Sequence, residues 1–292
     1  EGKNRKGDIG LEIECEGVTV PFLDSSSRYW KSVPEGSLRN GVEYVLRNPV
    51  PIQHLDDALS EWSELTATAS FEPSIRTSVH VHINVSDLTY SEYVRAVGVY
   101  WLVENLLVGL NGSVREGNLF CLRAKDASNS VSYVLDSLAS MKLIQPHPDA
   151  FKYSALNLVA LSKYRSMEFR FIRGTVYPKI MKFWAENLFS FVHKTRTFRD
   201  LGKVLELIDF NDVRPFLRQA LTPALYTAVT KKYLPHELNQ LVCENYNYVS
   251  KLDAVMKKDL PRKSPVVRTT NDDLDEVPVQ AVHSFNLEGV TF

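Results

Sequence analysis

The stretch Val79-His80-Val81-His82-Ile83-Asn84-Val85 limits the possible folds of this chain more than any other part of its sequence. Apolar residues alternate along it with two histidines and an asparagine, and this period of two is typical of a β-strand with unlike faces. A solvent-facing strand usually carries Thr, Lys, Glu or Ser instead. Two histidines at positions i and i+2 point the same way, so both can bind one metal or reach one phosphate. We therefore expect a functional face here, with a pair of structural histidines as the alternative.

Three further stretches, at residues 8–16, 42–46 and 166–175, predict strands with the same division between an apolar and a polar face. The unusual polar residues on these strands are, in chain order, Glu12 and Glu14, Glu43, and Glu168 with Arg170. Carboxylates two apart on a strand lie on one face, roughly 7 Å from each other, and repel unless they are solvated or bridged by cations. A water-facing strand is the alternative interpretation of residues 8–16, and a surface carboxylate is the alternative for Glu43. Asn40-Gly41, just before the second stretch, is a strong hairpin turn signal.

The remaining sequence predicts mostly helices, with Leu, Val, Ala and Tyr at helical spacing. The expected helices cover residues 54–69, 90–110, 130–140, 177–193, 200–208, 212–221, 223–234 and 236–260. Ser91 is the expected N-cap of the second helix, and residues 17–31 are expected to be irregular. We divide the chain into a region that carries the site at residues 1–195, a helical C-terminal extension at 196–260 and an extended tail at 261–292.

Composition excludes several classes of partner. The chain has 292 residues with a net charge of −1, and its Lys and Arg residues are scattered, so we expect no nucleic-acid binding. The most apolar run, from Val97 to Leu110, is interrupted by Glu104 and Asn105 and is shorter than a membrane span of ~20 residues. We expect a core helix there and no membrane contact. The three cysteines are far apart, which favours reduced thiols in a cytoplasm.

The polar strand residues combine four carboxylates with an imidazole. Hard oxygen ligands with one nitrogen suit Mg²⁺ or Mn²⁺ better than structural zinc. Arg170 beside such cations makes sense if a polyanion lies between them, and a nucleoside triphosphate is the natural candidate. The sequence has no Gly-rich phosphate loop. The loop at residues 111–127 carries Arg115 and Arg123, which could hold an anionic substrate or phosphate, or could be surface charges. This loop is the candidate lid.

These motifs resemble a known superfamily. Gly10-Leu11-Glu12-Ile13-Glu14 resembles the first-strand Glu-x-Glu of the glutamine synthetase-like carboxylate–amine ligases. Three more motifs follow in the order that this superfamily uses: Gly36-Ser37 with Gly41-Val42-Glu43, His80-Val81-His82-Ile83-Asn84, and Glu168-Phe169-Arg170. The closer resemblance is to its small amidoligase family, found in bacteria and phages, and it covers roughly residues 8–184.

The resemblance implies an α+β fold in which a curved, mainly antiparallel sheet carries helices on its outer side. It implies ATP and two or more Mg²⁺ (or Mn²⁺) ions at the concave face, in the cytoplasm of a bacterial or phage-infected cell. Glu12 would share the metal near the transferred phosphate with His80 and Glu168. Glu14 and Glu43 would bind the metal nearer the acceptor carboxylate.

The resemblance also assigns residues to the nucleotide. His82 and Asn84 would contact the nucleotide phosphates, and Arg123 and Arg173 are further cofactor-binding candidates. Arg170 would stabilise the transferring phosphoryl group, and together with Glu168 it forms the expected catalytic pair.

The expected reaction joins a carboxylate to an amine through an acyl phosphate. The substrates could be amino acids, peptides, cell-wall fragments or a protein side chain. One alternative is a metal-dependent hydrolase, which predicts no nucleotide requirement and leaves the pairing of Glu168 with Arg170 unexplained. The other is a non-catalytic assembly protein that works through its helical second half. It predicts that substitutions at Glu12 or His80 leave function intact.

Overall fold

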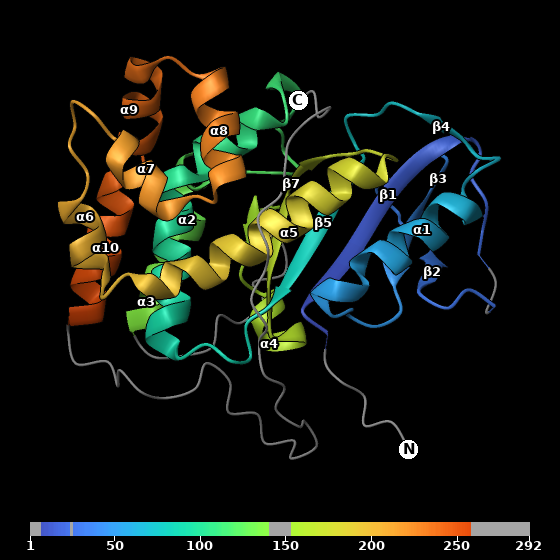
Figure 1. The fold of residues 1–292 in the computed structure, drawn as a ribbon, viewed down its shortest axis with the longest axis horizontal. Helices are drawn as coiled ribbons and strands as arrows, with labels where there is room; N and C mark the ends of the chain where they lie inside the picture. The colour runs from blue at the N-terminus through green and yellow to red at the C-terminus, as the bar shows by residue number, and fades with distance from the viewer. Residues whose placement is uncertain (1–6, 24–25, 140–152, 258–292) are drawn as a thin grey trace.

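The computed structural model describes residues 7–23, 26–139 and 153–257 (Figure 1). The expected tail at 261–292 and the end of the last expected helix lie outside the described residues. The described part of the chain forms one antiparallel sheet with helices packed against it, so the predicted α+β class is confirmed. The finer likeness to a glutamine synthetase-like fold stays a prediction.

The sheet has seven strands among the described residues. They are β1 (Ile9–Thr19), β2 (Trp30–Val33), β3 (Gly41–Leu46), β4 (Ser70–Glu72), β5 (Ser78–Asn84), β6 (Leu156–Asn157) and β7 (Ser166–Arg173). Their order is β2-β3-β1-β5-β7-β6, and β4 pairs with the C-terminal end of β1. All these pairings are antiparallel. The four strands expected to carry the site therefore lie side by side, in the order β3, β1, β5, β7.

Three helices pack on the apolar face of the sheet: α1 (Leu55–Leu65), α2 (Tyr90–Leu110) and α5 (Pro178–Lys194), as Figure 1 shows. Aromatic pairs form this layer. Trp62 of α1 lies 4.9 Å from the ring of Tyr44, and Tyr100 of α2 lies 5.3 Å from the ring of Phe169. Because successive strand residues point to opposite faces, this packing leaves the polar side chains on the other face.

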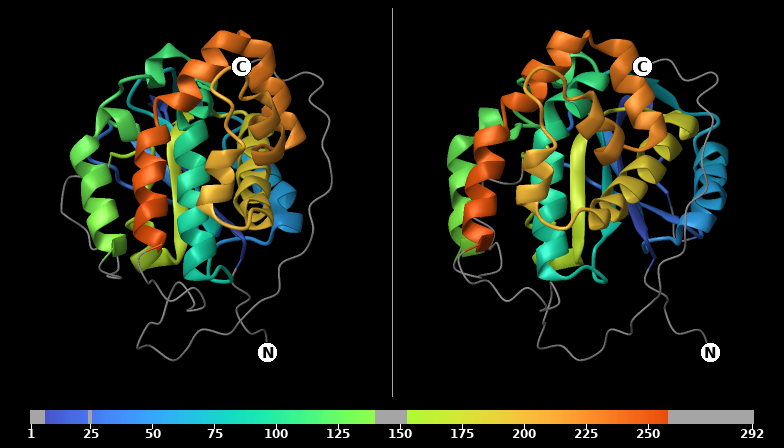
Figure 2. Two further views of the ribbon diagram at one scale, coloured as in Figure 1. Left: turned by 90° about the vertical axis from the view of Figure 1, so that its left-hand side faces the viewer. Right: turned by 60° about the vertical axis from the view of Figure 1, so that its left-hand side comes forward.

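The C-terminal helices form a further layer around α2 (Figure 2). They are α6 (Leu201–Glu206), α7 (Arg214–Ala220), α8 (Pro223–Lys232), α9 (Pro235–Cys243) and α10 (Tyr246–Lys257). Their buried side chains belong to the same hydrophobic core as the sheet. The prediction of one helix over residues 236–260 is wrong. The helix breaks at Asn245, whose buried side-chain amide donates to the Trp101 carbonyl 2.7 Å away.

Other sequence expectations need correction. The N-cap of α2 is Thr89, not Ser91, because the Thr89 hydroxyl accepts from the Glu92 backbone and Glu92 bonds back to Thr89. Residues 17–31 are not wholly irregular, because β1 continues to Thr19 and β2 begins at Trp30. The two other α-helices among the described residues are α3 (Ser128–Ala139) and the short α4 (Ala160–Tyr164).

α2 is confirmed as a core helix. It is long and apolar enough to cross a membrane, but every residue of its apolar window is buried inside the protein. All three cysteines are free thiols, and Cys15 and Cys121 are buried.

Candidate functional site

A cavity of about 400 Å³ opens on the polar face of the sheet. Its lining includes five carboxylates but only two arginines and one lysine, so its charge is predominantly negative. The residues that line it are Glu12, Glu14, Glu35, Ser37, Glu43, Arg76, Ser78, His80, Phe120, Tyr153, Asn157, Val159, Ala160, Lys163, Tyr164, Glu168 and Arg170. Four of the strands expected to carry the site contribute to it, as predicted from their alternation.

Strand register determines which of these side chains meet. Glu12 of β1 lies directly opposite His80 of β5, and His82 lies opposite Glu168 of β7. Glu14 lies opposite Glu43 of β3. Like charges directly opposite each other destabilise a sheet. A cation bound near Glu14 and Glu43 would reduce this repulsion.

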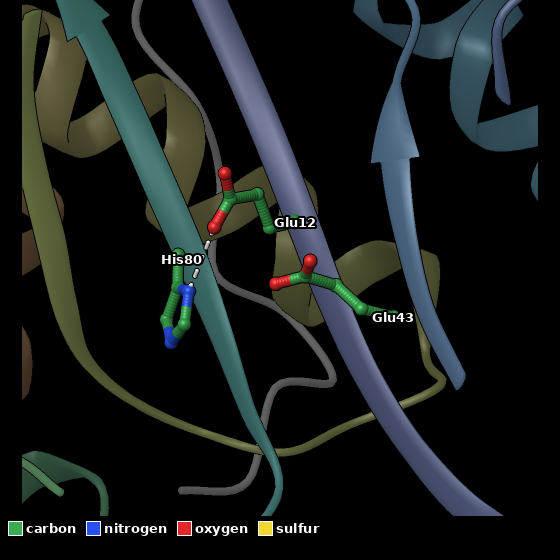
Figure 3. A group of neighbouring side chains, drawn as sticks. All are labelled: Glu12, Glu43 and His80. Atoms are coloured by element: carbon green, nitrogen blue, oxygen red, sulfur yellow. Dashed lines mark hydrogen bonds and ion pairs between the residues drawn. The ribbon is translucent and has the colours of Figure 1, made fainter. Parts of the chain in front are cut away.

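Glu12 lies at the centre of a cluster that also contains Glu43, His80, His82 and Glu168. Figure 3 shows Glu12 with Glu43 and His80. Its Oε2 is 3.0 Å from His80 Nδ1, and its Oε1 is 3.2 Å from His82 Nε2. Two groups with metal-ligand spacing share it: Glu12, Glu43 and His80, and Glu12, His82 and Glu168. In each group the ligand atoms lie within 4.8 Å of one another. This grouping differs from the one implied by the resemblance, because Glu43 joins His80, and His82 joins Glu168.

These groups fit divalent cations. His82 is 9% exposed, and its Nε2 has no hydrogen-bond partner although a carboxylate oxygen of Glu12 is close. A buried polar atom without a partner is costly, and a cation would satisfy this one. Each group offers two carboxylates and one imidazole. Carboxylates suit Mg²⁺ and Mn²⁺, and the imidazole adds a preference for Mn²⁺ over Mg²⁺.

Electrostatics agree with a cation site. Burial by itself would raise the pKa of Glu12, but the adjacent imidazoles of His80 and His82 hold that pKa well below its usual range. Burial, then the charges of Glu12 and Glu14, raise the pKa of Glu43 to about 8. The cluster therefore has more negative charge than its histidines can neutralise.

Glu168 and Arg170 form a fixed pair at the edge of this cluster. The Arg170 Nη1 donates to Glu168 Oε1 and lies 3.3 Å from His80 Nδ1. Asn157 Nδ2 donates to the other oxygen, Oε2 of Glu168, at 2.7 Å. Burial alone would raise the pKa of Glu168, but the charges of Arg170 and His82 lower it. Arg170 Nε is buried and has no partner within the described part of the chain.

Arg115 lies behind this pair instead of in the cavity. Its Nη2 donates to the Arg170 carbonyl at 2.6 Å, its Nε donates to the Phe171 carbonyl at 3.2 Å, and it is 1% exposed. It therefore supports the backbone of β7 and cannot reach a phosphate in the cavity from this position.

Four residues expected to bind nucleotide do not line the cavity. One is His82, whose Nε2 is buried 3.2 Å from Glu12 Oε1. Asn84 closes the end of β5, where its Oδ1 accepts from the Ser86 backbone at 3.0 Å. Arg123 pairs with Asp126 at 2.7 Å. Arg173 is exposed at the end of β7 and borders a separate cavity of about 540 Å³.

Some residues of the site were not predicted. Ser78 shares the polar face of β5 with His80, so strand alternation extended by one more step would have found it. Asn157, on the two-residue strand β6, was not among the expected site residues. Lys163 and Tyr164 come from the short helix α4, and no local pattern connects them with the strands.

A scan against protein-family models found no match to this chain, and neither did a search of curated proteins. The resemblance to the amidoligases therefore stays a prediction.

Proposed function

We propose that this protein is an ATP-dependent carboxylate–amine ligase, an enzyme that activates a carboxylate by phosphorylation and joins it to an amine. The observation that carries the proposal is the position of Arg170. Its guanidinium lies at the edge of two cation-binding groups that share Glu12. A fixed positive charge beside two cation sites is favourable when an anion such as a polyphosphate lies among them.

Five residues would hold the cations: Glu12, Glu43, His80, His82 and Glu168. Bound Mg²⁺ or Mn²⁺ would neutralise the nucleotide phosphates and the charge that develops during phosphoryl transfer. The proposal is supported by strand register, which brings these five side chains together on neighbouring strands. Preorganised ligands need no rearrangement at the moment of reaction.

Arg170 would contact the transferring phosphoryl group. Glu168 fixes one end of its guanidinium, and Arg115 fixes the backbone that carries it. Arg170 is largely buried, so its charge acts in a low-dielectric environment where electrostatic stabilisation is stronger than in water. Lys163 and Arg76 add further positive charge to the cavity wall.

The charge of the cavity favours a cationic acceptor amine. Its five carboxylates outnumber its three Arg and Lys side chains. Two divalent cations and a nucleotide carrying four negative charges would cancel each other, so the cavity would remain negative with both bound. Such a field attracts an ammonium group, which must then lose a proton before it attacks.

The loop at residues 111–127 forms part of the cavity wall. Phe120 lines the cavity, and Asn118 donates to the Ile75 carbonyl across from it at 3.3 Å. An apolar ring at this position helps to exclude water, which would otherwise hydrolyse an acyl phosphate.

Thermal unfolding tests the proposal first. We expect Mg²⁺ with a non-hydrolysable ATP analogue to raise the Tm more than either one alone, because a ligand that binds only the folded state stabilises it. ADP release should then need both a carboxylate and an amine. Stabilisation by metal alone, with turnover that needs no nucleotide, would contradict the proposal and favour a metal-dependent hydrolase.

Two matched variants sharpen the test. Arg170→Lys keeps the charge but loses the planar guanidinium, so substrate-stimulated ADP release should fall by about 10²-fold or more. Arg173→Lys, three residues along the same strand but outside the cavity, should change little. Equal losses in both variants would show that Arg170 has no special role.

A further inference from the structure

We infer that Glu12 bridges two divalent cations, one on each of its carboxylate oxygens, and that Ser78 and Ser166 orient the two histidines that complete the pair. The inference deepens the proposed function, but it requires only cation binding and no nucleotide. It follows from the ring nitrogens that the two histidines turn toward Glu12.

The two histidines use opposite nitrogens. His80 presents Nδ1 to Glu12 Oε2 at 3.0 Å, whereas His82 presents Nε2 to Glu12 Oε1 at 3.2 Å. They are two residues apart on β5, opposite Glu12 and Gly10 of β1, so they reach the carboxylate from neighbouring positions along the strand. Figure 3 shows Nδ1 of His80 turned toward Glu12 and its second nitrogen turned away.

Ser78 determines which nitrogen of His80 carries the proton. The Ser78 hydroxyl donates its only proton to Glu14 Oε2 at 2.5 Å. Its oxygen is 2.7 Å from His80 Nε2, so toward the ring it can only accept, and Nε2 must carry a hydrogen. Nδ1 of the neutral ring then keeps its lone pair, which faces Glu12 Oε2 and the Arg170 Nη1 and can bind a cation.

We infer that Ser166 has the matching role for His82, through the other ring nitrogen. Its hydroxyl oxygen lies 3.0 Å from His82 Nδ1, and both side chains are buried. A hydrogen on Nδ1 directed at Ser166 leaves the lone pair on Nε2, the buried atom that has no hydrogen-bond partner. A cation between this nitrogen and Glu12 Oε1 would give the Nε2 lone pair a partner.

Each cation then has a third protein ligand. Glu43 completes the group around His80, and Glu168 completes the group around His82. Glu14 belongs to neither group and comes no closer than 3.8 Å to His80 Nε2 as an ion pair. It acts through Ser78, as carboxylates that orient metal-binding histidines do.

Manganese provides a direct test, because bound Mn²⁺ is visible by electron paramagnetic resonance without turnover. The whole chain is titrated with Mn²⁺ alone. We expect two ions to bind per chain and to give the spectrum of an exchange-coupled pair at saturation. One ion per chain, or two ions with independent spectra, would overturn the bridging role of Glu12.

Serine variants test the positioning roles. Ser78→Ala and Ser166→Ala should each lower the affinity for one of the two Mn²⁺ ions by about 10–100-fold. At Mn²⁺ concentrations where only the other ion binds, the spectrum should be that of an uncoupled ion. Glu12→Gln should lower the affinity for both Mn²⁺ ions. Ser63→Ala, which removes a hydroxyl bonded to the Leu59 carbonyl on α1, is the matched control and should bind two coupled ions. Unchanged binding in both site variants would refute the positioning roles.

The role of Glu14 is tested by a double-mutant cycle. If Glu14 acts through Ser78, Glu14→Gln should weaken Mn²⁺ binding no more than Ser78→Ala, and the double variant should lose no more than either single variant. Additive losses would make Glu14 a direct ligand and overturn this part of the inference.

The wild-type chain offers a readout that does not depend on any variant folding. With diamagnetic Mg²⁺ bound, ¹⁵N spectra of the histidine rings should show hydrogen on Nε2 of His80 and on Nδ1 of His82. The same tautomer in both rings would refute the inference. A coupled Mn²⁺ pair in a protein with no nucleotide dependence would refute the ligase proposal alone, and ligase activity with a single ion would refute this inference alone.

Discussion

The buried carboxyl of Glu104 predicts an unusual dependence of stability on pH. Glu104 lies in the middle of α2 and is 1% exposed, and its Oε2 accepts from the Ala124 backbone at 2.6 Å. Burial raises the pKa of Glu104 to about 8, although the bond from Ala124 and the charge of Arg123 act in the opposite direction. The folded protein therefore keeps this carboxyl protonated at pH values where the unfolded chain has lost the proton.

The sign of the effect follows from proton linkage. Below the unfolded pKa of about 4.5 both states hold the proton, and stability is unaffected. As pH rises toward about 8, the unfolded state ionises freely and the folded state does not, so the free energy of unfolding falls. Each unit of pKa difference corresponds to ~1.4 kcal/mol. The full difference gives an upper limit of about 5 kcal/mol.

Glu104→Gln isolates this contribution, because glutamine keeps an acceptor for the Ala124 N–H and never ionises. Urea unfolding of both proteins should give similar free energies at about pH 5, and the variant should become increasingly more stable by about pH 9. Glu64→Gln, the same change at an exposed position of α1, should show no such divergence. Parallel pH profiles for wild type and Glu104→Gln would refute the reasoning, because they would mean that Glu104 titrates alike in both states.

Three further substitutions test other contacts. Thr89→Ala removes the N-cap of α2 and should lower the free energy of unfolding by about 1 kcal/mol in urea titrations; a change close to zero would count against the cap. Arg115→Met leaves carbonyls such as that of Phe171 without a donor and should cost about 2–4 kcal/mol; an unchanged unfolding midpoint would mean that water replaces the guanidinium. Asn157→Ala removes a donor from Glu168 and should weaken Mn²⁺ binding about tenfold with the unfolding midpoint preserved, whereas full affinity would show that Arg170 alone positions Glu168.

Much of the site was predictable because strand alternation reports which face a side chain occupies. Glu12, Glu43, His80, Glu168 and Arg170 were all assigned to polar faces, and all five line one cavity. The apolar face was equally clear, since the alternating aromatic residues of β7 pack on α2 and α5. Face assignment needs only the period of two and no knowledge of strand order.

Partners within the site were less predictable, because they depend on register. Alternation places His80 and His82 on one face but does not say which carboxylate each one meets. The observed register puts His82 opposite Glu168 and His80 opposite Glu12, and this contributes to the two groups with metal-ligand spacing. Charge alone was a poor guide to phosphate-binding residues. Arg123, for example, does not line the cavity and pairs with Asp126.

A single irregularity in β7 explains why its polar face ends at Arg170. Val81 pairs with Phe169 and Val79 pairs with Ile172, so β7 holds one more residue than β5 between these pairs, as in a β-bulge. The alternation expected from the sequence therefore stops there. Arg115 donates to the Arg170 carbonyl at this point. A bulge can redirect a side chain beside an active site, so Arg115 should influence the direction of the Arg170 guanidinium without touching the cavity. Arg115→Met should then reduce nucleotide-dependent stabilisation as well as folding stability, and a loss of folding stability alone would separate the bulge from the function of Arg170.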